Sequence, residues 1–461
     1  MNTRDDAPRS PANRARVWWV WFNPAVVIAV LIAVLGAMYL AYAADPEANL
    51  HDFPIALVNS DEGDVIDGKP TNVGDQISSA LSSSIPAAEV RLRLVGANEA
   101  GLLMDDGKVF GAIVIPSDFT KRLGILAASG VVPGDVERPI LTVETNPRIG
   151  PYATATVTRI ADRALTAVNT SVGRQLSDTV TATLNSHNGA PATELTGAAR
   201  LALDQPIKVV VVPHRPLASG TGQGLSAFFY ALTLVLAGFI GAMIIHTMVD
   251  AGLGFTPTEY GPWFAHLPSV PISRLRTLIY KWLTMLAVAP VASAILLAVG
   301  AWLGVPDPHA LALFLYSALV IAAVGVTALS VLAALGTAGL LVNLVLFVVL
   351  GLPSTGGTIP VEETPRPIAW LSHFEPMRQV YLGIRAISYF DARLAAGLSR
   401  GLWMSLLGLA FGITLGITTT YLYDRRGMTR TAASPTGTRI ALSKLNRSPS
   451  GAPAASLSRM S

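Results

Sequence analysis

The sequence predicts a polytopic α-helical membrane protein with six transmembrane helices and both termini cytoplasmic. It also predicts a large α/β extracytoplasmic domain inserted between helices one and two. The 461 residues are 51% hydrophobic and only 14% charged, with a mean hydropathy of +0.49, which is too apolar for an ordinary soluble enzyme. Apolar runs long enough to cross a bilayer recur along the chain. A polar stretch with alternating strand and helix patterns separates the first run from the others.

Residues 1–17 are predicted to form a cytoplasmic tail and residues 18–44 to form transmembrane helix 1. The apolar run is too long for the core of a signal peptide, so we expect an anchor, although small residues near its end would also suit cleavage. The cluster of Trp18, Trp19 and Trp21 is typical of the aromatic belt at a membrane surface.

Residues 45–222 are predicted to form the extracytoplasmic α/β domain, which at about 180 residues is large enough for its own core. The expected strands are 53–59, 90–95, 109–115, 140–145 and 207–212, and the expected helices are 73–84, 97–106, 119–126 and 151–186. The last helix carries an apolar stripe from Val157 to Leu184. Such a stripe packs on the domain's own sheet or serves as a stalk or dimer contact.

Residues 223–424 are predicted to hold the other five transmembrane helices. Gly336 to Gly339 splits an apolar stretch that is too long for one crossing of about 30 Å, so a tight turn is expected there. The five expected crossings are 225–249, 277–303, 310–335, 338–353 and 402–423. We expect Asn343 to form a hydrogen bond between helices and the glycine-rich segment 220–224 to act as a flexible hinge.

The distribution of charge sets the expected orientation. The insert holds 20 acidic and 14 basic residues, whereas the rest of the chain holds 10 acidic and 19 basic. Because basic residues stay on the cytoplasmic side, we expect the insert outside the plasma membrane and both tails inside. The excess of arginine over lysine, 27 to 6, beside the richness in alanine, glycine and valine, favours a bacterial cell. The tail 425–461 is predicted to be basic and disordered, and to lie on membrane lipids. The balance gives no support for nucleic-acid binding.

Several kinds of chemistry are not predicted. The chain contains no cysteine, and neither Gly68-Lys69 nor Gly107-Lys108 continues into a phosphate-binding loop. The histidines lack metal-ligand spacing, so no catalytic, cofactor or metal site is expected and the chain is not predicted to be an enzyme. The last three predicted crossings have no ionisable residue in their middles, which disfavours transport driven by an ion gradient.

The predicted cytoplasmic loop 250–276 is a candidate docking site for a partner, because aromatic side chains dominate docking energetics. The candidate docking residues are Tyr260, Trp263, Phe264 and Arg274. The alternative is an interfacial helix whose Arg274 and Lys281 reach lipid phosphates.

The segment after residue 350 is a candidate extracellular gate. Glycine and proline break it, and broken backbone at membrane depth is tolerated only against protein or a water-lined cavity. The candidate gate residues are Gly356, Gly357, Pro360, Glu375 and Pro376. A purely structural cap is the alternative.

Three motifs resemble those of the YhgE/Pip-like branch of the ABC-2-type permeases. They are Ala56-Leu-Val-Asn-Ser-Asp-Glu-Gly63, Phe110-Gly-Ala-Ile-Val-Ile-Pro-Ser-Asp-Phe119, and Thr355-Gly-Gly-Thr-Ile-Pro360 with Phe374-Glu-Pro-Met377. The resemblance covers nearly the whole chain and implies that 223–424 is a permease domain. It also implies a homodimer or heterodimer with a related permease, and a separate ATP-binding cassette ATPase that docks between spans two and three and carries the ATP.

We therefore expect an exporter subunit that moves an apolar or amphipathic substrate. Two alternatives remain from the sequence: an envelope surface receptor of the phage-adsorption type, and a scaffold for envelope assembly.

Overall fold

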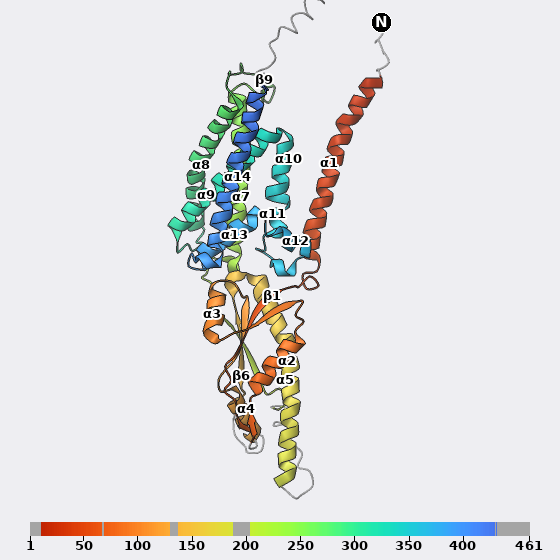
Figure 1. Cartoon of the computed structure of the whole chain (residues 1–461), viewed down its shortest axis with the longest axis vertical. Helices are drawn as coiled ribbons and strands as arrows, with labels where there is room; N and C mark the ends of the chain where they lie inside the picture. Colours follow the sequence, from red (N-terminus) through yellow and green to blue (C-terminus); the bar gives the residue numbers. More distant parts are fainter. Residues whose placement is uncertain (1–10, 67–68, 130–136, 188–202, 429, 431–461) are drawn as a thin grey trace, which may run out of the picture.

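The computed structural model describes residues 11–66, 69–129, 137–187, 203–428 and 430. It consists of a bundle of long apolar helices and an α/β domain that lies at one end of that bundle (Figure 1). The start of the first helix and the end of the last helix both lie at the opposite end of the bundle (Figure 1). The α/β domain is therefore separated from both of these helix ends by the length of the bundle.

Five helices in the described part of the chain are long and apolar enough to cross a membrane. They are α1 (Pro11–Ala44), α7 (Leu225–Gly252), α8 (Arg274–Trp302), α9 (Ala310–Leu335) and α14 (Leu398–Arg425). Each overlaps a predicted crossing, because an apolar run of about 20 residues can satisfy its backbone within lipid only as a helix.

The remaining predicted crossing, residues 338–353, is the fifth along the chain and is a shorter and interrupted segment. Gly336, with φ +62°, ends α9 at a tight turn, where the sequence predicts one. The chain then continues through α10 (Ala338–Leu344), a π-helical turn η3 (Val345–Val349) and α11 (Gly351–Ser354). The Asn343 side chain donates a hydrogen bond to the carbonyl of Ala328 at 3.0 Å, which confirms its predicted role between helices.

Helix α9 lies at the centre of the bundle, and α7, α8 and α14 pack around it. In an apolar stretch of 18 residues within each helix, 72% is buried in α9 and 22% is buried in α14. A Cβ on Gly238 of α7 would lie 2.8 Å from the Cβ of Val324, and one on Gly412 of α14 would lie 2.6 Å from the Thr327 hydroxyl. Small residues at such crossings allow the close van der Waals packing that holds helices together in lipid.

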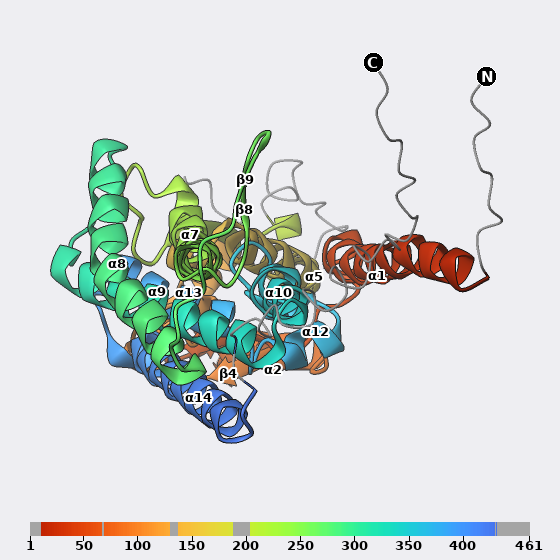
Figure 2. The same ribbon diagram turned by 90° about the horizontal axis from the view of Figure 1, so that it is seen from above.

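Helix α1 stands to one side of the other helices (Figure 2). Among its described side chains, those that make polar contacts with the other helices lie at the end nearer the α/β domain. The Tyr39 hydroxyl donates to the carbonyl of Val348 at 3.3 Å, and the Tyr42 hydroxyl accepts from the N–H of Ile359 at 2.9 Å. Most of its large apolar side chains from Val26 to Leu40 are exposed, as a surface that faces lipid or another apolar helix would be.

The α/β domain is built on a five-stranded sheet with the order β4-β1-β5-β6-β7. The pairing is parallel except between β5 and β6, and Ile55 of β1 lies opposite both Leu92 and Gly111. The strands are β1 (Phe53–Asn59), β4 (Val90–Leu94), β5 (Gly111–Ile115), β6 (Ile140–Thr145) and β7 (Lys208–Pro213). Each overlaps an expected strand. A small hairpin joins β2 (Asp64–Ile66) and β3 (Lys69–Thr71).

Among the described residues, four helices accompany the sheet: α2 (Val73–Ser84), α3 (Ala97–Asp105), α4 (Phe119–Ser129) and α5 (Pro151–His187). The apolar stripe of α5 is buried from Val157 through Leu165 and on to Val180, in the same cluster as Leu57 of β1. The stripe therefore packs on its own domain, which is the first of the two roles predicted for it.

Candidate functional site

The first two sequence motifs meet where β1 and β5 end. Asp61 follows β1, and its carboxylate accepts the backbone N–H groups of Gly74 at 2.9 Å and Thr120 at 3.0 Å. These amides lie in the first turns of α2 and α4, whose N–H groups lack partners within the helix. The Thr120 hydroxyl also donates to Asp61 and accepts the N–H of Val73 at 2.8 Å. The motif residues therefore hold the starts of α2 and α4 against the end of the sheet at which β1 and β5 finish.

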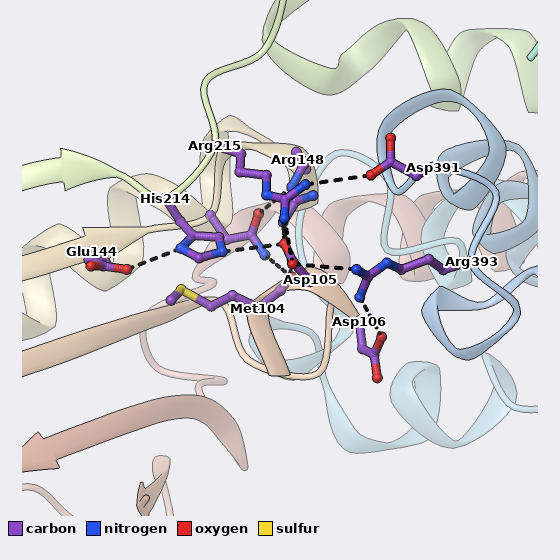
Figure 3. Close-up of polar contacts among 10 residues, drawn as sticks. Met104, Asp105, Asp106, Glu144, Arg148, His214, Arg215, Asp391 and Arg393 are labelled. Atoms are coloured by element: carbon purple, nitrogen blue, oxygen red, sulfur yellow. Dashed lines mark hydrogen bonds and ion pairs between the residues drawn. The ribbon is translucent and has the colours of Figure 1, made fainter. Parts of the chain in front are cut away.

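A cluster of charged residues, which we call the junction network, lies where the α/β domain meets the membrane helices (Figure 3). At its centre is the carboxylate of Asp105, at the end of α3. It pairs with Arg148 at 2.9 Å and with Arg215 at 2.7 Å, and His214 lies 3.3 Å away. Burial alone would raise the pKa of Asp105, but the hydrogen bond from Arg148 and the charge of Arg215 bring the pKa below its ordinary value.

The junction network continues into the segment that follows α13 (Pro376–Tyr389) (Figure 3). Arg393 lies 3.6 Å from Asp105 and 3.5 Å from Asp106, and Asp391 lies 3.6 Å from Arg215. Charges from the two parts of the molecule are thus interleaved. Movement of α13 relative to the α/β domain would have to break these contacts.

A second polar contact between the two parts surrounds Glu363. Its fully buried carboxylate accepts the hydroxyl of Thr156 at 3.1 Å, and Arg159 of α5 lies 3.9 Å away. Arg159 also pairs with Glu47 at 2.5 Å, just after α1. Burial raises the pKa of Glu363 to about 7. The α/β domain is therefore joined at this point both to α1 and to the segment between α11 and α13.

The predicted gate residues lie between the end of α11 and the start of α13, which includes Pro376, but they do not share one cavity. Gly356 and Pro360 line a cavity of about 410 Å³ between the α/β domain and α13, which we call the junction cavity. Gly356 has φ +70°, and a Cβ there would lie 2.5 Å from Nη1 of Arg378. Gly357 packs against the ring of Phe228 in α7, where a Cβ would overlap the ring atoms.

Glu375 and Pro376, the other two predicted gate residues, begin α13. The Glu375 carboxylate caps this helix by accepting the N–H of Arg378 at 3.0 Å. Within the part of the chain that the structure describes, its Oε1 atom has no hydrogen-bond partner. Burial raises the pKa of Glu375 to about 8. Pro376 instead lines an apolar cavity of about 290 Å³ between α9, α13 and α14.

At the opposite end of the bundle a buried ion pair joins α7 to α8. Lys281 lies 2.6 Å from Asp250, and both side chains are almost fully buried. Arg430 pairs with Asp250 at 2.8 Å, and His246 lies 3.0 Å from the Lys281 ammonium. The expectation that Lys281 reaches lipid phosphates is therefore wrong, because a carboxylate inside the bundle satisfies its charge.

The predicted docking loop forms a hairpin. The structure therefore contradicts the alternative prediction of an interfacial helix. Strands β8 (Thr258–Tyr260) and β9 (Trp263–Ala265) pair antiparallel, with Glu259 opposite Phe264. The hairpin projects from the bundle in the view along its length (Figure 2). Gly261, with φ +61°, permits the tight turn between the strands, which a continuous helix could not contain.

The structure brings together only some of the predicted docking residues. Trp263 and Phe264 are 76% and 65% exposed on the hairpin. The side chain of Tyr260 lies outside the described residues. Arg274 lies at the start of α8, where its Nε atom donates to the carbonyl of Met428 at 2.6 Å and its backbone N–H donates to Asp424 at 3.0 Å. Arg274 thus joins α8 to α14.

Sequence reasoning missed the junction network and the buried Asp250–Lys281 pair. The network residues lie far apart in sequence, from Asp105 to Arg393, so no local spacing indicates them. Asp250 and Lys281 lie at the ends of two predicted crossings, and their opposite charges on adjacent helices were a signal that could have indicated the pair.

Comparison with known proteins gives one match that covers most of the chain. The profile of the family described as ABC-2 family transporter protein matches residues 18–421. A crystal structure of one domain of a protein assigned to the ABC type-2 transporters of Thermotoga maritima MSB8 is 17% identical. The match covers 36% of the present chain and 89% of the Thermotoga domain. Its TM-score of 0.22 is too low to support an argument. None of the curated proteins matches the chain.

Proposed function

Because it matches the family profile over residues 18–421, the chain belongs to the ABC-2 family of transporter proteins, and we propose that it is the permease subunit of an exporter driven by a separate ATPase. Family membership supports a role as a membrane permease, and proteins of this family lack an ATPase domain of their own. The energy for transport would then come from a partner subunit that binds and hydrolyses ATP.

We place the hairpin β8–β9 and both tails in the cytoplasm and the α/β domain outside the plasma membrane of a bacterial cell. The unequal distribution of basic residues favours this orientation. The hairpin, the end of α14 and the start of α1 lie at the end of the bundle away from the α/β domain (Figure 1), as six crossings would require. In this arrangement the interrupted segment 338–354 makes the fifth crossing.

The observation that carries the proposal is the exposed aromatic pair on the hairpin. Trp263 and Phe264 present large apolar surfaces at the end of the bundle where a cytoplasmic motor would dock. The chain on both sides of the hairpin leads into the helices that the Asp250–Lys281 pair joins, at 2.6 Å. A force on the hairpin would therefore reach α7 and α8 together.

We propose that the substrate is apolar or amphipathic and moves along an interface between two related permease subunits, either two copies of this chain or two different chains. The large apolar side chains exposed on α1 suit contact with lipid or with a second subunit. The family assignment does not favour the receptor and scaffold alternatives.

Purification from native membranes tests the docking surface. The wild-type chain should co-purify with an ATP-binding subunit that is labelled by a photoreactive ATP analogue. Trp263→Ala combined with Phe264→Ala should abolish this association, because it removes the exposed aromatic surface. Trp302→Ala is the matched control, since Trp302 is also highly exposed but lies at the other end of α8. Equal recovery of the ATP-binding subunit with the double variant would overturn the docking assignment.

A further inference from the structure

The junction cavity carries an excess of positive charge. It lies between the α/β domain, which contributes Pro54, Asp106–Lys108, Phe110 and Ile149, and α13 with the segments on either side of it. Its charged lining consists of the cations Lys108, Arg378, Arg385 and Arg400 and the carboxylates Asp106 and Glu362. Asp106 is already engaged, at 3.0 Å from Lys108 and 3.5 Å from Arg393. The three arginines therefore face the cavity with Glu362 as the remaining carboxylate.

Arg385 is the most deeply buried of the four cations that line the cavity. It is only 7% exposed, and its guanidinium lies between the rings of Tyr381, at 5.5 Å, and Phe390, at 5.4 Å. Its Nε–H finds no hydrogen-bond partner and its guanidinium no carboxylate among the residues that the structure describes. A buried cation without a partner is costly, whereas one that faces a cavity can be satisfied by an anion bound there.

The neighbouring Arg378 and Arg400 add further positive charge to the same cavity. Arg378 donates from Nη1 to the carbonyl of Thr355 at 3.2 Å, and Arg400 donates to the carbonyl of His373 at 3.3 Å. Neither bond supplies a negative charge. Burial lowers the pKa of Arg378, and the charges of Arg385 and Arg400 lower it further, while Glu362 opposes them. The three guanidinium groups thus repel one another across the same cavity.

We propose that the junction cavity binds an oxyanion, either free or as the phosphate group of a lipid, with Arg385 as its main ligand and Arg378 and Arg400 beside it. Guanidinium groups present paired N–H donors that match phosphate oxygens. A volume of about 410 Å³ accommodates a group the size of a lipid headgroup. The site lies at the end of the bundle next to the α/β domain, so an anion there would hold the two parts of the molecule together.

The proposal can be tested on the full-length protein in detergent, with inorganic phosphate as the probe. Titration calorimetry should detect phosphate binding, and phosphate should raise the melting temperature of the wild-type protein. Arg385→Gln should weaken phosphate binding about 10- to 100-fold, as expected for loss of charge-assisted hydrogen bonds. Arg400→Gln changes an exposed side chain, should also weaken binding, and decides the question if the Arg385 variant does not fold. Arg366→Gln, which alters an exposed arginine outside the cavity, should leave binding unchanged.

A second measurement identifies the source of the anion. Native mass spectrometry from nanodiscs should show whether the wild-type protein retains phosphatidylglycerol in preference to phosphatidylcholine. Retention of phosphatidylglycerol that is lost in the Arg385 or Arg400 variant supports a lipid headgroup, and phosphate binding without lipid retention supports a free anion. If the wild-type protein binds neither, or if both variants bind as the wild type does, the proposal is wrong. Because the site is remote from the hairpin, this result is independent of ATPase docking.

Discussion

Replacing Asp105 with asparagine is expected to loosen the α/β domain from the membrane helices. The Asp105 carboxylate lies 2.9 Å from Arg148, 2.7 Å from Arg215 and 3.6 Å from Arg393, and the last of these follows α13. Asparagine keeps the size of the side chain but removes its charge. The three guanidinium groups then lose the counter-ion that they share.

Most of the cost of this substitution comes from Arg148. Its side chain is 5% exposed, whereas those of Arg215 and Arg393 are 49% and 37% exposed. A buried charge left without its partner costs about 3–5 kcal/mol, while each exposed pair contributes roughly 0–1 kcal/mol. We therefore expect Asp105→Asn to destabilise the junction by about 3–5 kcal/mol.

The same group predicts a dependence on pH. The pKa of Asp105 is lower in the folded protein than its ordinary value of 3.8, so its ionised form stabilises the fold above that value. This contribution is lost as the pH falls through the folded pKa. The asparagine variant should lack this acid-dependent loss.

Hydrogen–deuterium exchange of the full chain in detergent measures the effect. Asp105→Asn should increase exchange in α3 and in residues 390–397. The control is Asp106→Asn. Among the described residues Asp106 pairs with the partly exposed side chains of Lys108 and Arg393, so this substitution should cost at most about 1 kcal/mol. Asp105→Leu with Arg148→Met should restore protection, because it removes both buried charges. Equal exchange in the two single asparagine variants would refute the reasoning.

Three further predictions follow from other buried polar groups. Lys281→Met should lower the melting temperature by a cost of about 3 kcal/mol, and Asp250→Leu in the same chain should recover most of it; a further fall would contradict the pairing. Burial raises the pKa of Glu363 from 4.5 to about 7, so the stability that its protonated form contributes is complete below pH 4.5 and is lost by about pH 7. Glu363→Gln should flatten the melting temperature across this range, and an unchanged slope would count against the assignment. Asp61→Ala should cost about 1–3 kcal/mol and expose the starts of α2 and α4 to exchange, whereas Asp64→Ala should not.

The positions of the long apolar helices, of the helices in the α/β domain and of most strands could be predicted from the sequence, because hydrophobic periodicity is a local property. Helix α13 (Pro376–Tyr389) was not predicted. The turn at Gly336 and the hydrogen bond of Asn343 also follow from local chemistry, since one needs a positive φ and the other a partner within lipid. The packing of the α5 stripe on its own sheet was the first of two expected alternatives.

Other features depend on contacts that no local pattern encodes. Residues 258–265 form a hairpin and not the interfacial helix that was the alternative prediction. The positive φ of Gly261 and the pairing of β8 with β9 determine this structure. The π-helical turn at Val345–Val349 interrupts a run that reads as one apolar helix. The exposed or buried state of Arg385 is set by Tyr381 and Phe390 around it, so the junction cavity appears only in three dimensions.

The central claim is that this chain is a permease whose hairpin couples it to an ATPase. The most direct measurement is ATP hydrolysis by the ATP-binding subunit reconstituted in proteoliposomes with the wild-type chain or with the Trp263→Ala, Phe264→Ala variant. We predict that the wild-type chain stimulates hydrolysis several-fold and that the variant does not, while Trp302→Ala behaves as the wild type. Hydrolysis that is the same with the wild-type chain, with the double variant and without either would contradict the account.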